Sequence, residues 1–216
     1  MKKIYLSIVA AVSLMFVSCT ADWLNTDPST AVPSDDAIKN IDDAQVALNG
    51  IYRLASAHSY YGDNYLYYAD CRGEDVQARI NKGAGRRVSP YYFFDVTADD
   101  NFNITLVWNQ PYKVIHQANS LIEKLYAGNA KPEEVARIKS EALAMRGLAL
   151  FDLTRLFGMP YTLDNGASLG VPIEIQTTLE DHAPERNTVA QCYEQVLKDL
   201  NDASGGLTKE KHDAYM

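Results

Sequence analysis

The sequence predicts a mainly α-helical fold, built from tetratricopeptide-like helical pairs with long irregular loops. Apolar residues recur at intervals of three and four in four segments, which is the period of an amphipathic helix. Capping residues stand at the expected ends of these segments. Glycines and prolines interrupt the two longest stretches between them, as is typical of loops. No clean repeat period is visible, although the helical pairs have the size of tetratricopeptide units.

The first two helices are predicted at residues 41–55 and 115–125. Asn40 is a suitable N-cap for the first, and Asp42 and Asp43 complement the dipole of its first turn. The second ends near Gly128. The apolar positions of the two helices are Ile41, Ala44, Leu48, Ile51 and Ala55, then Ile115, Ala118, Ile122 and Leu125.

The other two helices are predicted at residues 132–156 and 188–203. Pro132 occupies a first-turn position of the third helix, which closes before Gly158. Thr188 and Gln191 form a capping box that starts the fourth helix, which ends at Gly205. The expected inward residues of this last helix are Cys192, Val196, Leu200 and Ala203.

The loops hold several motifs that could carry chemistry. The tyrosine-rich stretch after the first helix is predicted to be irregular, with short strands such as Tyr91–Val96, and residues 158–186 read as one long loop. The string Gly166–Gly170 matches the nucleophile elbow GxSxG, but Pro172 disfavours the helix that this motif needs, so we interpret it as a loop. Glu74 and Asp75 could be half of a glycosidase pair, or simply solvated carboxylates.

Metal and thiol chemistry are weakly indicated. The histidines His58, His116, His182 and His212 show no ligand spacing, so no metal site and no cofactor are predicted. Turn residues are favoured over a cation loop at Asp95, Asp99, Asp100, Asn101 and Asn103. Two buried free thiols are favoured over a disulfide between Cys71 and Cys192.

Charge and the amino terminus indicate the compartment. Twenty Lys and Arg against 28 Asp and Glu give a net charge of −8, which argues against nucleic acid as a partner. Residues 1–18 have the charged leader and apolar stretch of a signal peptide. Ser18 and Cys19 end that stretch as in a bacterial lipobox, so we expect lipidation at Cys19, with an ordinary cleavable signal as the alternative. Residues 19–36 then form a lipidated tether.

The tyrosines are the candidate ligand-binding residues. Exposed aromatic rings stack on the apolar faces of sugar rings, and their hydroxyls add hydrogen bonds. Packing of the loop against a helical core is the favoured alternative. The five candidates crowd into nine residues: Tyr60, Tyr61, Tyr65, Tyr67 and Tyr68.

Four strings stand in order along the chain: Ala47–Tyr52 (ALNGIY), Trp108–Ile122 (WNQPYKVIHQANSLI), Glu141–Tyr161 (EALAMRGLALFDLTRLFGMPY) and Pro184–Leu200 (PERNTVAQCYEQVLKDL). Together with the lipobox and the loop Gly170–Ile173, they resemble the RagB/SusD family of nutrient-uptake outer-membrane lipoproteins. Gly147 departs from the family's usual alanine, which suits close approach of another helix. Pro111 should kink the second helix or make it restart at Tyr112.

The resemblance implies a SusD-like helical domain over residues 37–207 and a non-catalytic, surface-exposed lipoprotein of the outer membrane. Such proteins bind oligosaccharide or peptide nutrients and deliver them to a SusC-like TonB-dependent transporter. It assigns no catalytic residue, and its motif residues Trp108, Asn119, Arg146 and Asp199 are expected to join helices. Two alternatives remain open: a helical-repeat scaffold for proteins, and a secreted glycoside hydrolase.

The strings cover less than half of a typical family member, so this chain is expected to be a truncated N-terminal portion. Residues 208–216 should then be poorly ordered. The helix at 188–203 should present an unpartnered apolar stripe through Cys192, Val196 and Leu200.

Overall fold

The computed structural model describes residues 37–71, 73, 104–125, 130–178 and 183–207. Their helices lie in the compact unit Ile38–Met216. They are α2 (Ile41–Ala55), α3 (Asn64–Asp70), α5 (Ile104–Lys124), α6 (Pro132–Phe157), α7 (Tyr161–Asp164) and α8 (Val189–Ser204). The described residues contain no strand, only an isolated antiparallel bridge between Leu169 and Thr188. The expected mainly α fold is confirmed.

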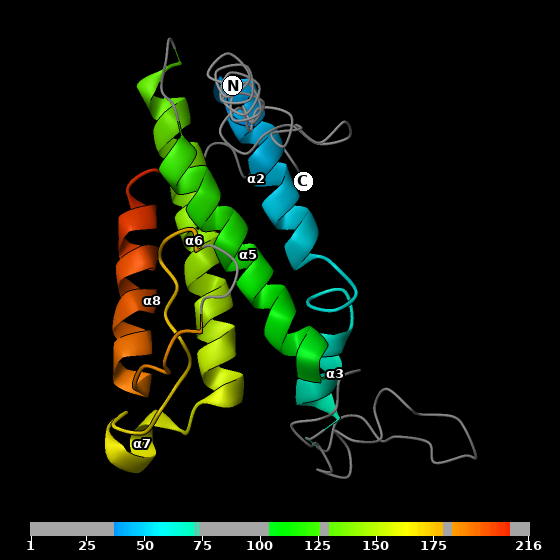
Figure 1. Ribbon diagram of the computed structural model, residues 1–216, viewed down its shortest axis with the longest axis vertical. Helices are drawn as coiled ribbons and strands as arrows, with labels where there is room; N and C mark the ends of the chain where they lie inside the picture. The colour runs from blue at the N-terminus through cyan, green and yellow to red at the C-terminus, as the bar shows by residue number, and fades with distance from the viewer. Residues whose placement is uncertain (1–36, 72, 74–103, 126–129, 179–182, 208–216) are drawn as a thin grey trace, which may run out of the picture. The chain divides into compact units, whose positions relative to one another are not determined.

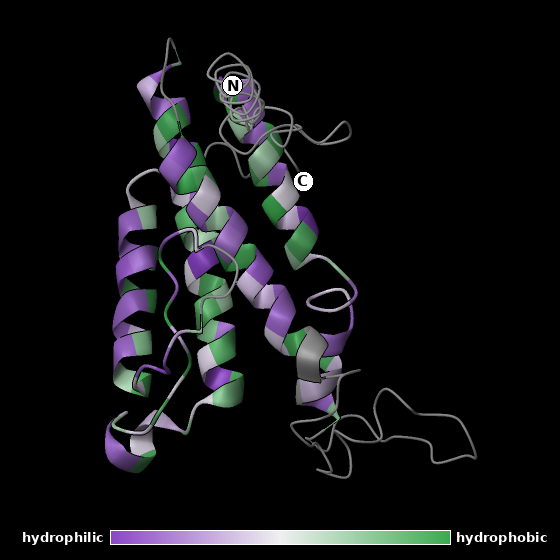
Figure 2. Cartoon of the chain, viewed as in Figure 1, coloured by the Kyte–Doolittle hydropathy of each residue, from purple (hydrophilic) through white to green (hydrophobic). Residues whose placement is uncertain are grey.

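Four helices run antiparallel in the order α2, α5, α6, α8 (Figure 1). The most extensive contacts are those of α6 with α8 and with α5, and α2 packs on both α5 and α6. Figure 2 shows apolar and polar residues interleaved along these helices, as expected where one face of each helix is buried. The largest fully buried aliphatic side chains between them include Leu48, Ile51, Ile115, Leu121, Ile138 and Leu153.

The predicted helix starts are confirmed at three helices. The Asn40 side chain accepts from the Asp43 N–H at the start of α2. Pro132 stands in the first turn of α6. At α8 the Thr188 hydroxyl accepts from the Gln191 N–H, and the Gln191 side chain accepts from the Thr188 N–H. Because these signals act within one helical turn, they can be read without the tertiary structure.

Helix α5 differs from its prediction. It begins at Ile104 and continues through Pro111 as one helix, so of the two expected outcomes, a kink or a restart at Tyr112, the restart is wrong. A proline inside a helix removes one backbone hydrogen bond and costs about 3 kcal/mol. Pro111 is buried, and α5 packs along both α2 and α6. Burial along this length outweighs the cost of the proline.

Two segments predicted to be irregular contain short helices. Part of the tyrosine-rich stretch forms α3, in which Tyr65 packs into the main core and Tyr68 into a smaller buried cluster with Cys71. The loop after α6 contains the single turn α7, and its C-cap Asn165 has a positive φ of 57°. The short strands proposed at Tyr91–Val96 lie outside the described residues, as do residues 208–216.

The expected stripe on α8 is only partly right. Cys192 and Val196 are buried in the core that α8 shares with α6, whereas Leu200 is 42% exposed and Leu197 is 59% exposed. The exposed apolar edge of α8 therefore runs through Leu197 and Leu200. The expected close approach at Gly147 is confirmed, because a Cβ there would lie 3.3 Å from Asp199 Cβ and from Leu200.

Candidate functional site

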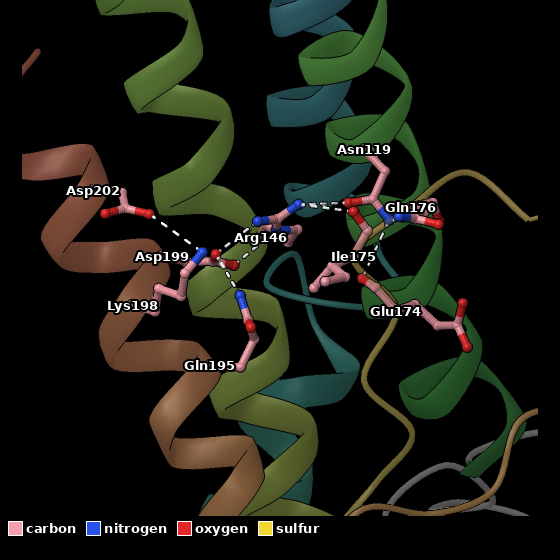
Figure 3. A network of polar contacts seen from close by, with 9 residues as sticks. All are labelled: Asn119, Arg146, Glu174, Ile175, Gln176, Gln195, Lys198, Asp199 and Asp202. Carbon is pink, nitrogen blue, oxygen red and sulfur yellow. Dashed lines mark hydrogen bonds and ion pairs between the residues drawn. The ribbon is translucent and has the colours of Figure 1, made fainter.

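A buried polar network joins three of the helices (Figure 3). Arg146 on α6 donates from Nε to Asp199 Oδ2 and from Nη2 to Asp199 Oδ1, both at 2.7 Å. Its Nη1 donates to Asn119 Oδ1 on α5 at 2.9 Å. Asp199 is fully buried and Arg146 is 7% exposed. The bidentate pair thus fixes α8 against α6, and Asn119 ties both to α5.

Asn119 also holds the extended segment Gly170–Thr178, here called the strap. Its Nδ2 donates to the backbone oxygens of Glu174 and Gln176, at 3.2 and 3.0 Å. Tyr112 donates from its hydroxyl to the Pro172 oxygen at 2.9 Å, and burial raises its pKa. Three of the motif residues, Asn119, Arg146 and Asp199, therefore join structural elements as expected. No ligand is needed to explain them.

Trp108 belongs to the same side of α5. Its ring lies 5.3 Å from the Tyr112 ring and meets Phe157 edge-on at 4.9 Å, measured between centroids. The Phe157 contact joins α5 to the end of α6, as expected of this motif residue. Trp108 also remains partly exposed.

Three of the candidate tyrosines converge on one carboxylate. The hydroxyls of Tyr60, Tyr61 and Tyr65 donate to Asp152 at 2.6, 2.7 and 2.6 Å. Asp152 is only 1% exposed, and Arg155 lies 3.4 Å from it. We call these four residues, three tyrosines and Asp152, the tyrosine cluster. It anchors the turn before α3, and the first turn of α3 itself, to α6.

Burial governs the electrostatics of this cluster. It raises the pKa of Asp152, and the hydrogen bonds from Tyr60 and Tyr61 oppose that rise. Burial, followed by the field of the Asp152 carboxylate, raises the pKa of Tyr60 far above its ordinary value. Burial and the hydrogen bond to Asp152 also raise the pKa of Tyr61. The phenols of Tyr60 and Tyr61 therefore stay protonated and donate to the carboxylate.

The five candidate tyrosines thus differ in exposure. Tyr60, Tyr65 and Tyr68 are buried, at 1%, 5% and 7%, Tyr61 is half-buried, and Tyr67 is 39% exposed. Packing accounts for the three buried rings. Only Tyr67 and part of Tyr61 offer a surface to a ligand, and that role stays a prediction.

Sequence reasoning missed Asp152, although a signal was present. Asp152 falls on the buried face of α6, beside Ala149 and Leu153 in the apolar stripe. A carboxylate on such a face demands partners, because an unpaired buried charge is costly. The partners themselves lie 87 to 92 positions away in sequence, so periodicity could not name them.

The other motifs in the described residues have structural roles. Ser168 of the GxSxG string donates to the Asp164 carboxylate, in a loop that follows the short helix α7 rather than a strand, so the loop interpretation is confirmed. Cys71 and Cys192 are buried free thiols, also as expected. Within the described ranges no group of three potential metal ligands is found. Cys19, Glu74, Asp75, His182, His212 and the Asp95–Asn103 loop lie outside those ranges.

An apolar groove of about 520 Å³ lies along α6, α7 and α8. Its aromatic wall is formed by Phe151, Tyr161 and Tyr193. The ring centroid of Tyr193 lies 6.1 Å from that of Phe151 and 5.8 Å from that of Tyr161. The exposed Leu197 and Leu200 complete it. Among the described residues no helix is both long and apolar enough to cross a bilayer.

Comparison with known proteins agrees with this architecture. A SusD-like family model, described as "Starch-binding associating with outer membrane", matches residues 22–216. The chain is 26% identical over 208 residues to "SusD-like protein P2" of Formosa agariphila, covering 96% of this chain and 38% of that protein. The chain thus spans less than half the length of this curated relative.

Solved structures show the same fold. A SusD superfamily protein from Bacteroides thetaiotaomicron VPI-5482 superposes with a TM-score of 0.74 at 64% identity, covering 79% of this chain and 38% of that one. A SusD-like carbohydrate-binding protein from Bacteroides vulgatus ATCC 8482 has a TM-score of 0.67 at 24% identity, covering 79% and 36%. The second likeness shows the fold alone.

Proposed function

Because this chain belongs to the SusD-like family, we propose that it is a non-catalytic protein that binds oligosaccharide or peptide nutrients at the bacterial outer membrane. One observation carries the proposal: the family match runs through residues 22–216 and so includes all the described helices. The family's description names starch binding and association with the outer membrane. A fold alone does not imply a function, so the ligand has to be tested directly.

The geometry favours binding over catalysis in one respect. The serine of the only hydrolase-like string in the described residues donates its hydroxyl to Asp164 and follows a helical turn. A nucleophile elbow instead needs a strand before the serine and a base beside it. The buried Asp152 is enclosed by three phenols. These polar groups hold the fold together, which suits a binding protein.

Calorimetric titration of the whole chain with maltoheptaose, a panel of other neutral oligosaccharides and a set of short peptides tests the proposal. We expect saturable heat with at least one of these ligands. Reducing ends are counted in parallel, because a glycoside hydrolase would release them. Turnover would replace the binding function by a hydrolase, and absence of binding to every ligand would overturn the proposal.

We further propose that Cys19 carries lipid and that the protein hands its ligand to a SusC-like TonB-dependent transporter. Two or three acyl chains anchor a protein stably, since each buried methylene contributes about 0.8 kcal/mol. Cys19→Ala should be exported but should leave the membrane pellet after a carbonate wash. Ser18→Ala keeps the cysteine and is the matched control. Retention of Cys19→Ala in the pellet would refute lipidation at this residue.

A protein-binding scaffold is the second candidate, favoured by the apolar groove along α6, α7 and α8. Exposed aromatic and leucine side chains gathered in one concavity are typical of protein-contact sites. A scaffold would be indifferent to added oligosaccharide in a thermal-shift measurement. A binding protein for glycans should instead show a melting temperature that rises with ligand concentration.

A further inference from the structure

A hollow of about 500 Å³ lies between α5 and the strap, apart from the tyrosine cluster and the apolar groove. A second hollow of about 330 Å³ adjoins it, and the two share Trp108, Tyr112, Glu174 and Thr178. Volumes of this order are typical of small-ligand sites. The aromatic pair Trp108–Tyr112 therefore stands where the two hollows meet.

The larger hollow has one wall on α5 and one on the strap. Asn109, Lys113 and Gln117 are four residues apart on α5, so they share one face of the helix. Glu174, Gln176 and Thr178 line the hollow from the strap. Both series line the hollow. Two rows of polar side chains thus face the aromatic pair.

The aromatic pair is held rigidly. Trp108 packs edge-on against Phe157, and the Tyr112 hydroxyl is bonded to the Pro172 oxygen. The strap in turn is fixed by the two hydrogen bonds from Asn119. A platform that is already ordered loses little entropy when a ligand binds.

The charge of the lining selects among ligand classes. Lys113 and Glu174 carry opposite charges, His116 adds an imidazole, and the other polar lining residues are amides and hydroxyls. Asn109, Lys113 and Gln117 are exposed, and no hydrogen bond of theirs to another described side chain is found. Amides offer paired donors and acceptors to vicinal hydroxyls, and aromatic faces accept the apolar side of a pyranose ring. The hollow therefore suits a neutral, polyhydroxylated ligand.

We propose that this hollow, centred on Trp108 and Tyr112, is a subsite for a neutral oligosaccharide. The inference rests on the proposed glycan-binding function and adds the place where the glycan is held. It assigns Asn109 and Gln117 to hydrogen bonding of sugar hydroxyls, and Trp108 to stacking.

Tryptophan fluorescence reports on this place directly. The chain has two tryptophans, Trp23 and Trp108. In a Trp23→Phe background, Trp108 is the sole reporter, and the probe is the oligosaccharide that titrates in calorimetry, with maltoheptaose first. We expect its emission to change with the same midpoint as the calorimetric curve.

Variants then test the contacts. Asn109→Ala and Gln117→Ala should each weaken binding about 2- to 10-fold, the effect of one lost hydrogen bond. Trp108→Ala should weaken it more than about 10-fold. Asn201→Ala and Lys198→Ala, exposed on α8, are the controls and should bind as the unchanged chain does. Asn109 and Gln117 keep the test decisive if Trp108→Ala fails to fold, because both are exposed.

The outcomes separate this inference from the function on which it rests. The subsite is overturned, and the binding function stands, if the chain binds the glycan without a change in Trp108 emission and Asn109→Ala and Gln117→Ala bind it with unchanged affinity. If Tyr67→Ala alone weakens binding, the site lies beside α3 instead. No binding of any panel oligosaccharide would overturn the subsite together with glycan binding.

Discussion

Removal of the Asp199 carboxylate should be the most damaging single change on α8. The Asp199→Ala variant leaves the Arg146 guanidinium, whose side chain is 8% exposed, without its counter-ion. Only neutral acceptors remain: Asn119 Oδ1 at 2.9 Å and the Ile175 oxygen at 3.4 Å. Breaking a buried pair in this way costs about 3–5 kcal/mol, because a charge stays buried without compensation.

The chain supplies a matched control within one turn of the same helix. Asp202 lies 3.6 Å from Lys198 Nζ, and these side chains are 53% and 66% exposed. An ion pair in such a solvated position contributes about 0–1 kcal/mol. Asp202→Ala removes the same carboxylate from the same secondary structure. The difference between the two variants therefore measures what burial and the hydrogen bonds from Arg146 and Gln195 add at Asp199.

Urea unfolding followed by circular dichroism measures both free energies of unfolding. Since whole domains have only about 5–15 kcal/mol of stability, Asp199→Asn is included as a milder change that keeps one acceptor. The double variant Arg146→Met/Asp199→Leu should be more stable than Asp199→Ala, because no charge is then left unpaired. Equal losses for Asp199→Ala and Asp202→Ala would refute the reasoning. The single variants Arg146→Met and Asp199→Leu complete a double-mutant cycle, and losses that add in the double variant would refute the reasoning too.

Three further changes test other parts of the fold. Because the pKa values of Tyr60 and Tyr61 are raised in the folded state, their contribution to stability is complete below about pH 10 and is lost above it, by up to about 1.4 kcal/mol per pH unit for each protected phenol. Urea midpoints measured between pH 9 and 11 should therefore fall less steeply in Tyr60→Phe than in the unchanged chain. An equal slope would contradict this. Gly50→Ala should raise the free energy of unfolding by about 0.5–1 kcal/mol, since no atom lies within 4 Å of the new Cβ. Gly147→Ala should gain less, because its Cβ meets α8, and thermal melts should show a higher melting temperature for Gly50→Ala than for Gly147→Ala. Thr188→Ala should cost about 0.5–2 kcal/mol in the same melts by removing the cap of α8, and an unchanged melting temperature would show that the cap contributes nothing.

Local sequence signals predicted the helices well where one turn contains the whole signal. The starts of α2, α6 and α8 follow from Asn40, Pro132 and Thr188, because an N-cap or first-turn proline acts on backbone groups within three residues. The prediction for helix α5 failed at Pro111, where a local signal indicated a break that the structure does not have. Its continuation depends on burial against α2 and α6, which no local pattern reports.

The candidate site was less predictable than the fold. The tyrosines between residues 60 and 68 stood out by composition, but their spacing said nothing about Asp152, which faces them from α6. The hollow beside Trp108 depends on the strap, which Asn119 and Tyr112 hold against α5. Neither wall of that hollow is a site on its own.

The helical class, the caps, the free thiols and the family resemblance of four ordered strings could be predicted from periodicity and from contiguous residues. Packing was needed to show that Leu200 stays exposed on α8, that Asp152 accepts hydrogen bonds from three phenols, and that α5 and the strap enclose a hollow. The physical reason is sequence separation. Contacts between residues 50 to 90 positions apart depend on which helix faces meet, and that choice is made by the packing of the whole domain.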